Sequence, residues 1–338
     1  MIAIKIHSLF YKEDIFFDMS LIKKYLVLSI IALSISDANA DNIILGAPKW
    51  STPARGEITN KANEKSDTLL TVSGSNIQLT QSQIDDKFSA PDWFPSQHKK
   101  MPSIIKSGKA PKVWACASCH LASGSGHPES ATLSGLSSQY IQTQMTSFSD
   151  GTRLDYSGHM NRMSAALTKD EIRAVSDWFS TLATKKVTNV LEVAQVPKTY
   201  LDDTRMRLKV FPVEMEDIAG RIIEIPEDLE KVKKRHPEST FISYVPQGSI
   251  TRGKSLVTMG GGKTIPCASC HGTNLTGSSI GPSIVGNFGT YTVRQLHGFK
   301  GGTRSGGNSA MMLGVVGNLT DNDIVDIAAY LTSLPVKK

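Results

Sequence analysis

Apolar side chains recur at helical spacing in both halves of the chain, each time behind a polar start signal. Residues 137–149 carry apolar side chains three and four positions apart, which predicts a helix with one buried face. A second such stretch follows Thr168, where an acidic residue three positions later completes a capping-box pattern. The other half repeats this stripe behind Thr320, and a further helix is predicted over 249–259.

The two halves are copies of one unit in nearly constant register. An offset of 151 residues superimposes the two occurrences of the pentapeptide C-A-S-C-H, at 116–120 and 267–271. The same offset carries one Gly-Thr-Arg step onto another, and after one inserted residue an offset of 152 carries Met160 onto Met312. A period this long predicts two tandem domains rather than a solenoid.

An export signal precedes the first unit. Lys23 and Lys24 stand before a short uncharged apolar run, and an A-x-A site follows, which is typical of a secretory signal peptide cut after Ala40. Because the residues before this signal extend its basic region beyond the usual length, we hypothesise that translation starts at Met19. The predicted boundaries are a signal peptide 1–40, a polar N-terminal arm 41–92, a first domain 93–184, an interdomain linker 185–247 and a second domain 248–338.

The arm and the linker differ in character from the two repeated units. The arm is rich in Ser, Thr and Asn, and we predict that it is loosely held. The linker contains extended pieces at 207–213, 221–225 and 241–245, each bounded by a proline. Because a structureless connection of this length is unusual, we expect it to lie against one or both domains. The predicted fold class is all-α, with an irregular linker that contains short extended segments.

Composition narrows the functional classes. In a chain of 338 residues, 40% hydrophobic and 20% charged residues exclude global disorder and a multi-span membrane protein. The net charge is +6, but no dense Lys/Arg block or nucleic-acid motif is present, so we predict protein partners and no nucleic acid. An exported chain with four cysteines must protect or use them, because its compartment is oxidising.

The repeated pentapeptide explains the four cysteines, because C-x-x-C-H is typical of covalent haem c attachment. Two thiols three residues apart can bond the two vinyl groups at one edge of a porphyrin, and the following imidazole can bind the iron. A four-cysteine zinc site or a thioredoxin-like pair is less consistent with two pairs 151 residues apart in a duplicated chain. The predicted attachment cysteines are Cys116, Cys119, Cys267 and Cys270, and the predicted iron-binding histidines are His120 and His271.

Met160 and Met312 are the predicted distal ligands, because they are equivalent in the aligned repeats. Both are expected in loops after the Gly-Thr-Arg step, where the chain can fold back over the open haem face. Met163 and Met311 have no methionine counterpart in the other repeat, whereas His159 remains an alternative ligand for the first haem. A thioether ligand raises the reduction potential of the iron and closes the site to substrates.

Arg153 and Arg304 recur at matching positions in the Gly-Thr-Arg steps. They are candidates to pair with haem propionates, and the alternative is that each is a solvated loop residue.

These motifs together resemble the tandem dihaem class I cytochromes c, and the cytochrome c4 group is the nearest. The resemblance covers about 93–184 and 248–338, and it implies two small helical domains, each around one covalently bound haem. It also implies His and Met ligation and single-electron transfer in the periplasm. The implied partners are a dehydrogenase or quinol-oxidising complex as donor and an oxidase or other cytochrome as acceptor, with association at a membrane surface allowed.

One departure from the family concerns the proximal side. The family usually places a proline after the haem motif, and the carbonyl of that proline orients the proximal imidazole. Pro282 fits in the second domain, whereas the first has Ala131 there, so the resemblance does not carry this hydrogen bond over to the first domain.

Two alternative functions share the haem motifs. A dihaem cytochrome c peroxidase type of enzyme needs one open haem face, and matching methionines in both repeats argue against it. An electron-accepting cytochrome subunit of a dehydrogenase differs in its partners rather than its chemistry. The sequence therefore favours an electron carrier without enzymatic activity.

Overall fold

The computed structural model describes residues 46–53, 67–202 and 206–336. The predicted signal peptide, the hypothetical start at Met19 and parts of the arm lie outside the described residues. Among those described, no helix is both long and apolar enough to cross a membrane.

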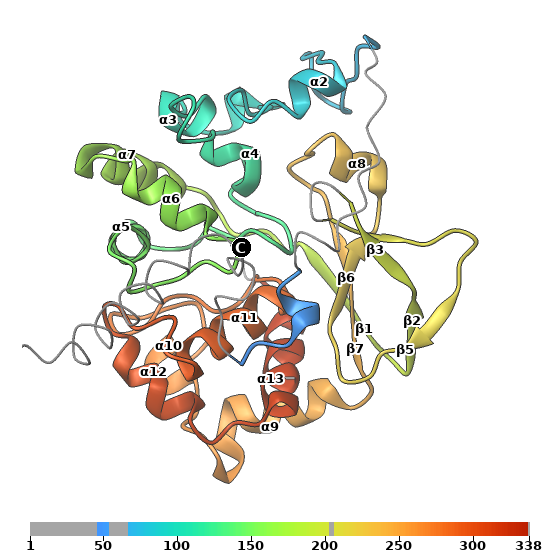
Figure 1. Cartoon of the computed structure of the whole chain (residues 1–338), viewed down its shortest axis with the longest axis vertical. Coiled ribbons are helices and arrows are strands. Elements are labelled where there is room, and N and C mark those ends of the chain that lie inside the picture. Colours follow the sequence, from blue (N-terminus) through green and yellow to red (C-terminus); the bar gives the residue numbers. More distant parts are fainter. Residues whose placement is uncertain (1–45, 54–66, 203–205, 337–338) are drawn as a thin grey trace, which may run out of the picture. The chain divides into compact units, whose positions relative to one another are not determined.

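The first repeat is helical (Figure 1). Its helices are η3 (Pro95–Gln97), α3 (Ser103–Lys106), α4 (Cys116–His120), α5 (Ser138–Ser149), α6 (His159–Ala165) and α7 (Lys169–Phe179). The capping box predicted for α7 is present, because the Thr168 hydroxyl accepts a hydrogen bond from the Glu171 amide at 3.2 Å. α5 packs against α6 and α7, and Phe179 is fully buried in the core beneath them.

The second repeat has the same helix order but a longer first helix. Its helices are α9 (Ser249–Met259), η4 (Gly260–Gly262), α10 (Ala268–His271), α11 (Gly289–Lys300), α12 (Ser309–Val316) and α13 (Asp321–Ser333). α9 has the predicted bounds and packs along α13, which begins at a capping box made by Thr320 and Asp323. In the first repeat the equivalent of α9 shrinks to the single turn of α3.

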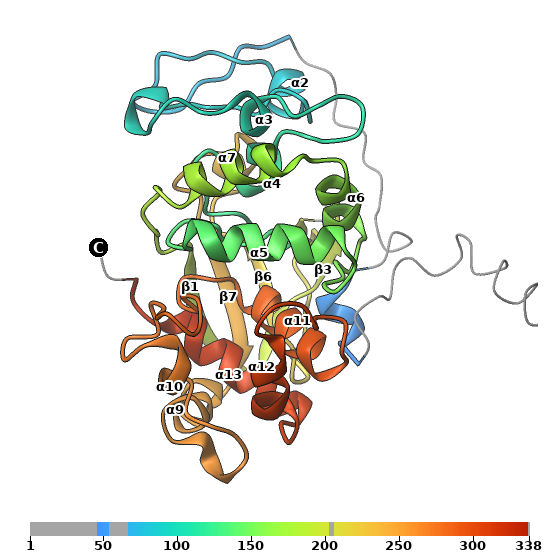
Figure 2. The same ribbon diagram turned by 90° about the vertical axis from the view of Figure 1, so that its left-hand side faces the viewer.

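The linker is more regular than the predicted irregular segment. Its elements are β1 (Thr188–Val193), β2 (Gln195–Pro197), β3 (Thr199–Leu201), β4 (Arg207–Lys209), β5 (Met215–Asp217), β6 (Ile223–Pro226), α8 (Leu229–Lys233) and β7 (Phe241–Pro246). β1, β7 and β6 form a sheet in that order, with β1 parallel and β6 antiparallel to β7 (Figure 2). β2 pairs with β5 and β3 with β4, both antiparallel. The two repeats are therefore helical, but the described chain as a whole is not all-α.

The linker contacts both repeats, as predicted. On β6, Glu224 is 1% exposed and accepts hydrogen bonds from the Gly289 and Thr290 amides at 2.8 and 3.1 Å. These amides open α11, so a buried linker carboxylate caps a helix of the second repeat. After α8, Arg235 donates a hydrogen bond to the carbonyl of Ser118 in the first repeat.

The described part of the arm packs more firmly than predicted. It includes η1 (Lys49–Ser51) and α2 (Gln81–Ile84), and Leu70 pairs with Leu79 through two backbone hydrogen bonds of 2.8 and 3.0 Å. Trp93, just past the arm, is 2% exposed in the same small apolar core, and its indole N–H donates to the carbonyl of Lys234 at 2.7 Å. The prediction that the arm is loosely held was wrong for residues 67–92, because their apolar side chains pack into a small separate core.

Candidate haem sites

In the first repeat, the pentapeptide forms α4 and faces a cavity of about 620 Å³. Cys116, Cys119, His120 and Met160 all line this cavity, so the structure brings the four predicted site residues together. Burial raises the pKa of the Cys116 thiol to about 12 and also raises the pKa of Cys119.

The proximal imidazole of the first repeat is oriented by a backbone carbonyl. Nδ1 of His120 donates to the carbonyl oxygen of Ala131 at 2.8 Å, and burial lowers the pKa of His120. This corrects the sequence-based expectation about the missing proline, because the bond needs a carbonyl in the right place and not the proline ring. With Nδ1 engaged, Nε2 is the ring nitrogen available to a metal.

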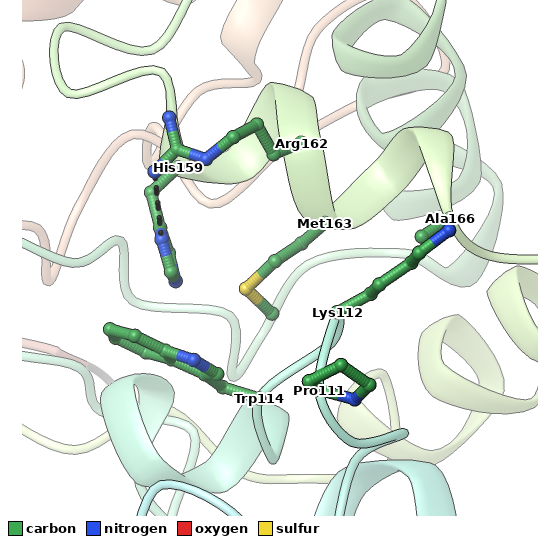
Figure 3. A pocket seen from close by; sticks show the side chains of 7 residues that line it. All are labelled: Pro111, Lys112, Trp114, His159, Arg162, Met163 and Ala166. Carbon is green, nitrogen blue, oxygen red and sulfur yellow. Dashed lines mark hydrogen bonds between the residues drawn. The ribbon is translucent and has the colours of Figure 1, made fainter.

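The distal side of the first cavity carries three candidate ligands on one short helix. Met160 and Met163 both line the cavity from α6, so the expectation that Met160 lies in a loop was wrong. His159 lines the same cavity, and its ring lies 4.2 Å from the ring of Trp114. His159 also lines a neighbouring cavity of about 420 Å³, where its ring lies between the Arg162 guanidinium and the Trp114 indole (Figure 3). Nη2 of Arg162 lies 3.5 Å from Nδ1 of His159.

The second repeat reproduces the proximal geometry. Nδ1 of His271 donates to the carbonyl oxygen of Pro282 at 2.7 Å, as the resemblance implied. The preceding Gly281 allows this approach, because a Cβ there would lie 2.9 Å from Nδ1. Cys267 and Met312 pack against the same apolar core, and Met312 lies within α12 rather than in the predicted loop. Burial raises the pKa of Cys267 to about 11.

The two recurrent arginines cross between the repeats. Arg153 donates to Gln144 of its own repeat at 2.7 Å and to Gln295 of the other repeat at 2.7 Å. Arg304 mirrors this pattern, with bonds of 3.0 Å to both Gln295 and Gln144. Each also reaches the tyrosine hydroxyl of the opposite repeat, Tyr291 at 3.1 Å and Tyr140 at 2.6 Å.

This network removes the solvated-loop alternative for Arg153, which is 6% exposed and lines the first cavity. The Gly-Thr-Arg steps also pair as an antiparallel bridge between the two arginines. Arg, Gln and Tyr recur at equivalent positions in the two repeats, so the sequence contained the residues of this interface. It did not indicate that each arginine would bind the glutamine and tyrosine of the other repeat.

A second interface contact was missed because it has no counterpart in the repeat. Arg294 on α11 is 2% exposed and lies 3.3 Å from the Glu129 carboxylate of the first repeat. Both residues line the first cavity, and the Tyr156 hydroxyl also donates to Glu129 at 2.6 Å. The Arg294 guanidinium and the Glu129 carboxylate therefore form a buried ion pair between the two repeats.

The donor set and the cavity fit a covalently bound haem. The two thiols lie on one helical turn, and a backbone carbonyl holds the imidazole that follows them. The thioether of Met160 belongs to a residue that lines the same cavity. Soft sulfur and imidazole ligands in an apolar pocket are those of a His/Met haem iron. The second repeat offers the same residue types with the same proximal hydrogen bond.

Comparisons with known proteins agree with this chemistry. The Cytochrome c family model matches residues 250–335. The chain is 41% identical over 68 residues to cytochrome c-554(548) of Halomonas halodenitrificans, which is 20% of this chain and 82% of that protein. It is 35% identical over 83 residues to cytochrome c4 of Azotobacter vinelandii, covering 22% of this chain but only 39% of the relative. It is 24% identical over 231 residues to the thiosulfate dehydrogenase electron acceptor of Thiomonas intermedia, covering 67% of this chain and 81% of that protein.

Proposed function

Because this chain belongs to the class I cytochromes c, in the tandem dihaem group that resembles cytochrome c4, we propose that it carries single electrons between protein partners in the periplasm. Two covalently attached haem c groups would supply the one-electron iron couple. The predicted signal peptide supports the location, and the family match and the relatives support the chemistry.

The residues of each repeat divide the work of holding one haem. In the first, Cys116 and Cys119 would form the thioethers, and His120 and Met160 would hold the iron. The carbonyl of Ala131 keeps the imidazole in one orientation and fixes its tautomer.

In the second repeat the corresponding residues are Cys267, Cys270, His271 and Met312, with Pro282 providing the carbonyl. With a histidine and a methionine bound, neither iron would offer a position for a substrate, so we expect the two sites to exchange electrons without transforming a small molecule.

One observation carries this proposal: the same imidazole-to-carbonyl hydrogen bond occurs in both repeats, at 2.8 and 2.7 Å. An enzyme with one open haem would need the two sites to differ in their ligands. The repeats instead keep the same proximal bond and equivalent methionines, even where the carbonyl comes from Ala131 instead of a proline.

The proposal is tested by haem counting and ligand-state spectroscopy of the holoprotein. We expect a pyridine haemochrome assay to give two haems per chain. Both should be low-spin, show the near-red sulfur–iron band when oxidised, and fail to react with carbon monoxide or peroxide. A high-spin fraction that consumes peroxide would instead indicate a peroxidase type of enzyme, and fewer than two haems would overturn the dihaem proposal.

A narrower version of the function is electron acceptance from a dehydrogenase. The similarity to the thiosulfate dehydrogenase electron acceptor favours it, because that match spans two thirds of this chain and so extends beyond one repeat. Stopped-flow reduction of the oxidised protein by candidate periplasmic dehydrogenases tests this version. Rapid reduction by one dehydrogenase, and slow reduction by the others, is the expected result.

A further inference from the structure

The linker reaches the haem motif of the first repeat through Arg235. After α8, the carbonyl of Lys234 accepts the indole N–H of Trp93 at 2.7 Å, which anchors the segment to residues beside the arm. The next residue, Arg235, has a φ of +51°, a conformation that is strained for a side chain with a Cβ. This turn directs its guanidinium toward α4.

Arg235 contacts the haem motif itself. Its Nη1 donates to the carbonyl of Ser118, which lies between the two attachment cysteines, and the side chain also lines the first cavity. Its other terminal nitrogen lies 3.7 Å from the Asp85 carboxylate. The Arg235 side chain is 19% exposed and that of Asp85 is 36% exposed, so water screens the acid more than the base.

A second cation lies at the same cavity as Arg235. The Lys87 ammonium lies 4.4 Å from the centre of the Trp114 ring, and both of these residues line the first cavity.

The sequence around the second motif offers no equivalent cation. Residues 264–293 contain no Asp, Glu, Lys or Arg, and Ser269 stands where Ser118 stands in the first repeat. Among the described residues, the hydrogen bonds and ion pairs include no arginine on the Ser269 carbonyl. Within the described part of the chain, the hydrogen bond of Arg235 to Ser118 therefore has no counterpart at the second motif, because Arg235 comes from the linker.

We propose that the positive charge of Arg235 raises the reduction potential of the first haem. This inference rests on the proposed function. Reduction of ferric to ferrous iron removes one positive charge from the site, so a fixed neighbouring cation favours the reduced form. An electron that moves from the second iron to the first oxidises one and reduces the other, and no proton or further reactant is needed. The charge of Arg235 therefore shifts this exchange toward the reduced first haem.

The test is a spectroelectrochemical titration of the holoprotein and five variants. Arg235→Gln should lower one of the two midpoint potentials and leave the other unchanged. We expect about a tenfold change in the equilibrium constant for electron exchange between the haems, which is about 59 mV for one electron. Arg235→Lys should keep most of the wild-type potential, because it keeps the charge. Asp85→Asn should shift the same potential in the opposite direction, since it removes the counter-charge.

A matched control lies in the same linker. Arg221→Gln removes a cation that is bonded to the Ile218 carbonyl at 2.9 Å and paired with Glu216 at 3.1 Å, so neither potential should move. The Met160→His variant identifies the wave of the first haem, because exchange of a thioether for an imidazole lowers its potential.

Opposite shifts for Arg235→Gln and Asp85→Asn cannot arise from simple loosening of the linker. If Arg235→Gln moves neither wave, moves both equally, or is not rescued by lysine, the role of Arg235 is wrong while the two-haem carrier stands. If Arg235→Gln does not fold, the sign of the Asp85→Asn shift decides the question alone. A chain with fewer than two haems fails the proposed function instead.

Discussion

Arg294 offers the sharpest test of how the two repeats are held together. Its guanidinium lies 3.3 Å from the Glu129 carboxylate, and it also donates to the carbonyls of Ser51 and Pro128 at 2.8 and 2.5 Å. The side chains of the ion pair are 2% and 10% exposed, so neither charge is well solvated. Arg294→Met replaces the cation with an apolar side chain of similar length. Among the hydrogen bonds of the described residues, the Glu129 carboxylate then keeps the one from the Tyr156 hydroxyl.

The expected loss follows from that burial. Removal of one partner of a buried ion pair typically costs about 3–5 kcal/mol, mostly because the remaining charge is uncompensated. The double variant Arg294→Met with Glu129→Gln should therefore be less destabilised than the sum of the single variants, with a coupling of about 0.5–3 kcal/mol. Coupling of this size would show that a large part of the loss belongs to the pair and not to packing.

Urea titrations of the holoproteins, followed by far-UV circular dichroism, measure the free energy of unfolding for each variant. Lys198→Met is the control, because it breaks an ion pair of 2.5 Å with Glu214 in which both side chains are about half exposed, and its unfolding free energy should stay close to wild type. A loss below about 1 kcal/mol for Arg294→Met, or strict additivity in the double variant, would refute the reasoning.

Three further predictions concern the sites and the linker. Met160→Ala should abolish the near-red sulfur–iron band of one haem and let that haem bind carbon monoxide, whereas Met163→Ala should keep the band; visible spectra of the oxidised and reduced forms distinguish them. Burial raises the pKa of Glu224, so ionisation opposes folding and stability should fall as pH rises from the ordinary glutamate range through the raised pKa; Glu224→Gln should flatten this dependence in urea titrations at several pH values. Gly281→Ala should reduce the haem content or shift the potential of the second repeat, because its Cβ would collide with the proximal imidazole, whereas Gly314→Ala, with nothing within 4 Å, should change neither in haemochrome and redox assays.

The parts of the fold that the sequence predicted well depend on interactions between near neighbours. α9 has the predicted bounds, and α7 begins at the predicted capping box, because spacing and caps act within a few residues. The pentapeptide likewise predicts haem chemistry, since two thiols and an imidazole on one helical turn are sufficient to specify it. Because the pentapeptide occurs in both repeats, the same prediction applies to the second site.

The parts that only the tertiary structure decided depend on groups that composition and spacing do not distinguish. A backbone carbonyl is present at every residue, so the sequence could not show that Ala131 would replace a proline as the acceptor for His120. The exchange of partners by Arg153 and Arg304 requires two helices from different repeats to meet, and the approach of Arg235 to α4 spans 117 residues. Such contacts are set by where distant segments come to lie once their apolar faces are buried, and local patterns contain no record of that.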